Sequence, residues 1–132
     1  IPVIVNGDIN CMEDVEMALS DSGADGVMIG RGTYGKPWFP SQVIHYLKTG
    51  ERLPDPDLET QLNIVLSHYN AMIEHYGEVT AVRMARKHLG WYTKGLHGSA
   101  EFRQQINRMD DPAAVKEAMR GFYLPLCEEM AA

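Results

Sequence analysis

Two short apolar segments near the start of the chain constrain most strongly what it can fold into. Residues 1–5 and 26–29 are nearly continuous apolar runs, and the residues between them carry a helical repeat of apolar positions. A continuous apolar run is typical of a parallel strand that is covered on both faces. The spacing therefore predicts a strand–helix–strand unit of about 30 residues, with parallel strands and a right-handed crossover.

The helix between these strands has start and stop signals in the sequence. Asn10 is the expected N-cap, and Glu13 stands three residues later, which is the spacing of a capping box. Val15 belongs to the expected apolar face, and Gly23 is placed to end the helix.

The rest of the chain is predicted to be helical, with no further strand. A short helix should end at Gly50, and residues 54–57 (Pro-Asp-Pro-Asp) form a rigid, charged connector that predicts a domain boundary. Apolar residues then recur at spacings of three and four, which predicts a long helix ending at Gly77, a second broken at Gly90 and two more after it. Four helices with short connections make a small bundle.

Glycine and polar residues follow both predicted strands. Asn6-Gly7-Asp8 comes after the first strand and Gly30-Arg31-Gly32 after the second. In parallel α/β architectures, ligands bind beyond the carboxyl ends of the strands. Glycine lets the backbone approach a phosphate, and arginine adds a charged planar fork. We therefore predict a phosphate site here; the alternative is that these glycines only make tight turns.

Positive charge is concentrated in one part of an acidic chain. The net charge is −6, but residues 83–108 carry +5 and the remainder −11. A basic segment of this kind favours a nucleic-acid partner. The cations in it are Arg83, Arg86, Lys87, Lys94, Arg103 and Arg108.

The spacing within the basic segment predicts one charged helix face. Arg83, Arg86 and Lys87 stand at i, i+3 and i+4, and Trp91 and Tyr92 follow among further cations. Cations and aromatic rings together suit RNA. The alternative is a solvated helix face with the two rings packed inside, and for the rings we favour that alternative.

Several classes of protein are disfavoured by what the sequence lacks. It has no apolar run of membrane-spanning length and no signal-peptide pattern. Cys11 and Cys127 are too few for a disulfide framework, and the five histidines have no metal-ligand spacing. We expect a cytoplasmic protein that binds neither a metal nor a membrane.

The chain closely resembles the bacterial tRNA-dihydrouridine synthases. The resemblance lies in two strings, IPVIVNGDI…GADGVMIGRGTYGKPWF and RMARKHLGWYTKGLHGSAEFRQQIN, which together cover nearly the whole chain. Other flavin and nucleotide barrels share much of the first string, whereas ARKHLGWYTKGL with SAEFR is more particular to this family. The resemblance implies a (β/α)8 TIM barrel that holds FMN, followed by a helical domain that grips tRNA.

Applied to this chain, the resemblance implies two domains and a set of residues that bind FMN and tRNA. Residues 1–53 would be the last strand–helix–strand portion of the FMN-binding TIM barrel, and residues 54–132 a helical tRNA-binding domain, so that the chain is α/β plus all-α and mostly helical overall. The residues implied for FMN are Asn6, Gly7 and Asp8 in one turn and Gly30 and Arg31 at the phosphate. Those implied for tRNA are Arg83, Arg86, Lys87, Lys94 and Arg103.

The resemblance also implies a reaction. FMN passes a hydride to uracil, a cysteine supplies the proton that completes 5,6-dihydrouridine, and NADPH reloads the flavin. In the family that cysteine belongs to an earlier barrel segment, and neither cysteine here matches its context. The chain opens inside a core strand without an initiator Met, so we expect a carboxy-terminal fragment that needs the missing N-terminal barrel segment and is inactive alone.

Two other readings stay open at this point. The chain could act as an isolated helical tRNA-binding module, or it could belong to another phosphate-binding flavin barrel oxidoreductase that acts on a small metabolite. The basic segment and the helical extension argue against the second, because a small substrate needs neither.

Overall fold

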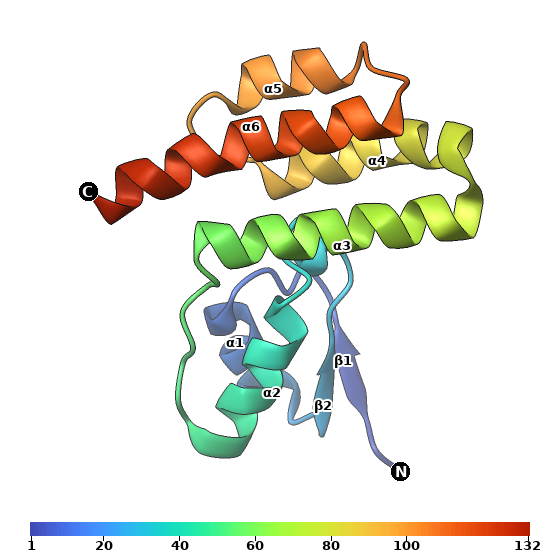
Figure 1. The fold of residues 1–132 in the computed structure, drawn as a ribbon. Helices are drawn as coiled ribbons and strands as arrows, with labels where there is room; N and C mark the ends of the chain where they lie inside the picture. The colour runs from blue at the N-terminus through green and yellow to red at the C-terminus, as the bar shows by residue number, and fades with distance from the viewer. The chain divides into compact units, whose positions relative to one another are not determined.

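The computed structural model describes residues 1–132, which are mostly helical with one small parallel sheet (Figure 1). In chain order the elements are β1 (Ile4–Asn6), α1 (Met12–Ser22), β2 (Gly26–Met28), the 3₁₀ turn η1 (Arg31–Thr33), α2 (Phe39–Thr49), α3 (Leu58–Tyr76), α4 (Glu78–Tyr92), α5 (Ser99–Ile106) and α6 (Pro112–Ala131). They form two compact units, Ile1–Asp55 and Pro56–Ala132. None of the helices combines the length and the apolar character that a membrane span requires.

The first unit contains the predicted strand–helix–strand arrangement. β1 and β2 pair in parallel, with Val5 opposite Val27, and this confirms the predicted strand direction. The expected cover on both faces is absent within this unit, because Ile4 and Met28 are more than half exposed. Residues 1–55 form a two-stranded sheet and not a closed barrel.

The core of the first unit lies between the sheet and the two helices that follow its strands. Its buried centre consists of Ile9, Val15, Phe39 and Val43. Val15 of α1 is completely buried, and Phe39 and Val43 bring α2 onto the same cluster. α1 and α2 therefore lie on the same side of the strands (Figure 1). This packing leaves the carboxyl ends of the strands clear.

The N-terminus of α1 differs from the prediction. The N-cap is Cys11, with extended backbone, and the partner in the capping box is Asp14, not Glu13. The Asp14 carboxylate accepts hydrogen bonds from the N–H groups of Asn10 (2.8 Å) and Cys11 (3.1 Å). Glu13 is engaged elsewhere, by Arg52. The predicted end of the helix at Gly23 is confirmed, because Gly23 is left-handed with φ 65°.

The second unit is a four-helix arrangement that begins at an aspartate cap. Asp57 accepts a hydrogen bond from the N–H of Thr60 (2.8 Å) and starts α3, and Asp111 caps α6 in the same way. α3 packs against α4 and α6, and α5 packs against the same two helices. The most deeply buried side chains include Val65, Tyr69, Ala85, Ile106, Met119 and Tyr123.

α4 does not break at Gly90, as the sequence predicted, but continues to Tyr92. A Cβ at Gly90 would lie 3.3 Å from Cδ of Arg103, which comes from α5. Glycine therefore stands here because a neighbouring side chain crosses the helix closely, and not because the helix ends. Thr93 caps the helix instead, with its hydroxyl donating to the carbonyl of Leu89 (2.9 Å).

Candidate functional sites

The turns after β1 and β2 form a single cavity of ≈ 380 Å³. The structure therefore brings together all six residues that the sequence singled out beyond the strand ends, although they come from segments more than twenty residues apart. The cavity is lined by Asn6, Gly7, Asp8, Ile9, Asn10, Gly30, Arg31 and Gly32.

Two glycines of this cavity leave open space, and a third makes a close contact. A Cβ added at Gly7 or Gly30 would meet nothing within 4 Å, so the backbone at both positions faces free volume. A Cβ at Gly32 would instead overlap the carbonyl oxygen of Ile9. Gly32 therefore lets the two turns touch, while Gly7 and Gly30 leave room for a ligand to approach the chain.

An ion pair joins the two turns. Nη2 of Arg31 lies 2.7 Å from Oδ1 of Asp8, and the two side chains are 76% and 80% exposed. A pair this exposed adds little to stability. Its consequence is geometric, since it holds the guanidinium group beside the cavity that Arg31 lines and leaves its other N–H donors for an anion.

Two side chains that the sequence did not assign to this site hold the arrangement in place. The side-chain amide of Asn10 donates to the carbonyl of Asp8 (2.8 Å), and Nζ of Lys36 donates to the carbonyl of Asn10 (2.6 Å). Lys36 comes from the loop after β2, so it ties one turn to the other from a second direction. No local periodicity marks such a contact, because its partners are 26 residues apart.

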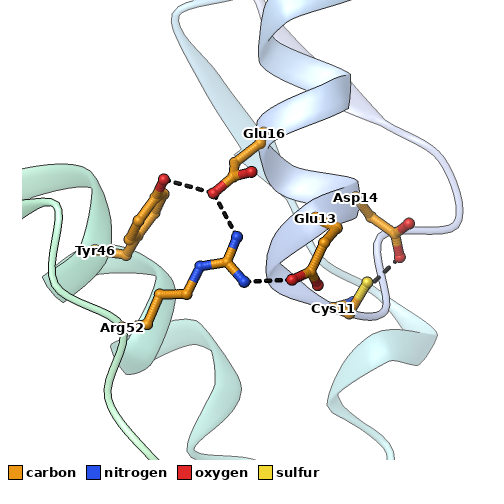
Figure 2. A network of polar contacts seen from close by, with 6 residues as sticks. All are labelled: Cys11, Glu13, Asp14, Glu16, Tyr46 and Arg52. Atoms are coloured by element: carbon orange, nitrogen blue, oxygen red, sulfur yellow. Dashed lines mark hydrogen bonds and ion pairs between the residues drawn. The ribbon is translucent and has the colours of Figure 1, made fainter.

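A polar network beside this site connects α1 with α2 and the segment after it (Figure 2). Arg52 donates to Glu13 and, at 2.7 Å, to Glu16, and the Tyr46 hydroxyl also donates to Glu16 (2.5 Å). The hydrogen bond from Arg52 is the main cause that lowers the pKa of Glu13, and that from Tyr46 the main cause for Glu16. The network stabilises the helix pair and lines no cavity described above.

Cys11 takes part in the cap of α1 and is not an activated nucleophile. Its thiol donates to the carboxylate of Asp14 (Figure 2). The backbone of Asp14 favours the thiolate, but desolvation and the hydrogen bonds to Asp14 and Glu13 outweigh it and raise the pKa of Cys11. Burial and the charges of Glu59 and Asp57 likewise raise the pKa of Cys127.

The second unit carries a depression of ≈ 540 Å³ between α4 and α5. Four of its seven lining residues are cations, and none is an acid. On a chain with a net charge of −6, this concentration of positive charge is suited to phosphate groups. The lining residues are Arg86, Lys87, Gly90, Trp91, Lys94, Arg103 and Asn107. Arg83 is exposed on α4 and is not among them.

Arg86 differs from the other cations because part of its side chain makes hydrogen bonds within the unit. Its Nη2 donates to the carbonyl of Met109 (3.1 Å) and to Oδ1 of Asp110 (3.0 Å), and 29% of the side chain is exposed. Arg86 thus ties α4 to the segment between α5 and α6. Lys87, Lys94 and Arg103 have no such tie to a carboxylate.

Trp91 is the aromatic residue that lines the depression. Nζ of Lys87 lies 5.8 Å from the ring centroid of Trp91, and the ring of His88 meets Trp91 edge-on at 5.0 Å. Burial, followed by the charges of His68 and Lys87, lowers the pKa of His88. Tyr92 is buried, as predicted, whereas Trp91 is only partly covered and takes part in the surface of the depression.

Comparison with known proteins finds relatives that match most of the chain. The family model described as dihydrouridine synthase matches residues 1–125. The chain is 58% identical over 123 residues to a probable tRNA-dihydrouridine synthase of Rickettsia bellii, covering 93% of this chain and 38% of that protein. It is 55% identical over 128 residues to the protein of the same name from Rickettsia conorii, covering 97% of this chain and 39% of that one.

A more distant group of relatives extends the similarity. The chain is 43% identical over 123 residues to tRNA-dihydrouridine synthase B of Pseudomonas putida, covering 93% of this chain and 36% of that protein. It spans about two fifths of the length of the curated relatives it matches. Since the family model matches all but the last seven residues, this chain belongs to the dihydrouridine synthase family.

Proposed function

We propose that this chain is part of a flavin-dependent tRNA-dihydrouridine synthase, an oxidoreductase that reduces specific uridines in tRNA to 5,6-dihydrouridine at the expense of NADPH. Its family membership and the names of its relatives support the reaction and the substrate. The observation that carries the proposal for this chain is the depression lined by four cations and no acid, because tRNA offers the phosphates that such a surface needs.

The residues at the strand ends fit the phosphate end of FMN. Arg31 and the backbone at Gly30 would bind the phosphate, and the turn from Asn6 to Asp8 would lie against the adjoining part of the cofactor. Open space at Gly7 and Gly30, beside a guanidinium group with free donors, supports this assignment. Bound FMN would supply the hydride that reduces the C5–C6 bond of uracil.

The cations of the second unit would bind the RNA backbone. Lys87, Lys94 and Arg103 would contact phosphates, and Arg83 would extend the charged face along α4. Arg86 would contribute the part of its guanidinium group that Met109 and Asp110 leave unused. Phosphate contacts position the RNA, and the target uridine must be unstacked before reduction.

The proton for the reduction would come from outside residues 1–132. Cys11 donates its thiol hydrogen to Asp14, and Cys127 lies on α6 of the helical unit. We therefore expect residues 1–132 alone to have negligible synthase activity. Their helical unit would still bind tRNA, because Pro56–Ala132 contains every residue of the cation-lined depression.

A tRNA titration tests the proposal directly. This chain is titrated with an unmodified tRNA transcript at several salt concentrations, with a hairpin RNA as competitor. Saturable binding that weakens with salt is expected, and the triple variant K87E/K94E/R103E should lose at least about tenfold in affinity. K48E is the control for one charge reversal outside the depression, and is compared with K87E alone as well, since Lys48 is exposed on α2 in the other unit. Equal binding by the triple variant and the control would contradict the proposed RNA surface.

A further inference from the structure

The backbone of Asp8 is held in an unusual conformation. Asp8 is the one non-glycine residue with positive φ, at 45°. Aspartate tolerates the left-handed region better than most residues, but some cost remains. A conformation of this kind persists where its surroundings fix it, and it often lies at a binding site.

The surroundings that fix Asp8 come from both neighbouring loops. The Asn10 amide holds the Asp8 carbonyl at 2.8 Å, and the Asp14 carboxylate holds the N–H of Asn10 at 2.8 Å. Nζ of Lys36 then binds the Asn10 carbonyl at 2.6 Å from the loop after β2. The backbone of Asp8 is therefore tied to the cap of α1 and, through Asn10, to the loop after β2.

The Asp8 carboxylate forms an ion pair with Arg31. The pair is 2.7 Å long and joins residues 23 apart in sequence across the cavity. Arg31 begins the short 3₁₀ turn η1, and most of its side chain is in water. An arginine in such a position has many rotamers, and binding an anion would require one of them.

Two effects of Asp8 on a bound phosphate oppose each other. Its negative charge repels the phosphate, and its hydrogen bond orients the arginine that attracts the phosphate. In a site this exposed, water screens the repulsion strongly. Bidentate recognition of a phosphate by arginine depends on the angle of the guanidinium plane, so orientation is the larger effect.

We infer that Asp8 is a positioning residue, which holds Arg31 in the direction that the flavin phosphate requires. The inference rests on the proposed function, because it assumes that the phosphate lies at Arg31. It gives Asp8 a role in orienting Arg31, beyond its place in the turn after β1.

The test compares FMN with riboflavin, which lacks the phosphate, on the full-length protein. Dissociation constants are measured from flavin fluorescence for the wild type, D8G, D8N, R31A and D8G/R31A. Glycine adopts the backbone of residue 8 without strain, and asparagine keeps a neutral acceptor. D21N, an exposed change at the end of α1, is the matched control for charge.

The expected result is specific to the phosphate. D8G should weaken FMN binding about tenfold and leave riboflavin binding unchanged, with D8N in between and D8G/R31A no weaker than R31A. Unchanged or tighter FMN binding by D8G, in a wild type that prefers FMN, would overturn the positioning role alone. A wild type that binds FMN and riboflavin equally would overturn the proposed phosphate site itself, and the positioning role with it.

Discussion

The side chain of Arg103 in α5 crosses α4 at Gly90, where a Cβ would lie 3.3 Å from the arginine Cδ. The glycine belongs to the same depression as the arginine that it accommodates. Helix stability and the position of a proposed RNA contact are thereby coupled at one residue.

Gly90→Ala should separate these two properties. Alanine favours the helix, so the free energy of unfolding should rise by up to about 1 kcal/mol. The new Cβ should displace Arg103, so affinity for tRNA should fall. Chemical unfolding and a tRNA titration measure the two effects. Gly121→Ala in α6 is the control, because nothing lies within 4 Å of its added Cβ. An unchanged tRNA affinity in Gly90→Ala, or a large loss of stability, would contradict this account.

Gly32→Ala should destabilise the first unit by about 2 kcal/mol or more, because the clash is with a backbone oxygen that cannot rotate away. The effect is read from the free energy of unfolding in urea. Gly30→Ala is the comparison, since an added Cβ there meets nothing within 4 Å and should cost far less. Similar losses for both variants would show that the contact between the two turns is unimportant.

Acid should weaken the contact between α1 and α2. The pKa values of Glu13 and Glu16 are lowered by folding from an ordinary value of 4.5, so their contribution is present above that value and is lost as pH falls through the lowered values. The urea midpoint should therefore decrease as the pH falls below about 4.5. Arg52→Gln should show a smaller decrease, since it removes donors to both glutamates. An identical pH dependence in wild type and variant would exclude the network as its source.

Arg86 and Lys87 should respond differently to replacement by alanine. Arg86→Ala leaves the Met109 carbonyl without its donor and should cost about 1 to 2 kcal/mol of unfolding free energy. Lys87→Ala should leave stability nearly unchanged and reduce the salt slope of tRNA binding by about 1. Thermal unfolding and titrations at several salt concentrations distinguish the two. Equal effects on stability would contradict the division of roles.

The helix ends were predictable where the backbone itself required glycine. Gly23 and Gly50 are left-handed, and α3 ends before Gly77, which also has positive φ. Such requirements are local, so the sequence near each position reveals them. The same holds for the two strand ends, whose polar and glycine residues meet in one cavity.

Most of the wrong predictions concern residues whose contacts lie far away in the sequence. The predicted cap of α1 is wrong by one residue, because the N-cap is Cys11 and the third helical position is therefore Asp14, while Glu13 pairs with Arg52. Gly90 resembled a helix end because nothing in its own segment reveals that Arg103 crosses there. The double contact of Arg86 with the segment before α6 was hidden for the same reason. Local patterns do not contain such pairings, which only the folded chain creates.

Every side chain of the cation-lined depression comes from residues 86–107, a single uninterrupted stretch of the chain. A surface of this kind is inherited as one block, unlike a site assembled from distant segments. Recombination between related genes could exchange the whole block in one step without disturbing the turns that follow the strands. Under the proposed function, the RNA contacts of the depression and the cofactor contacts of the turns therefore lie on separate stretches of the chain and can change independently.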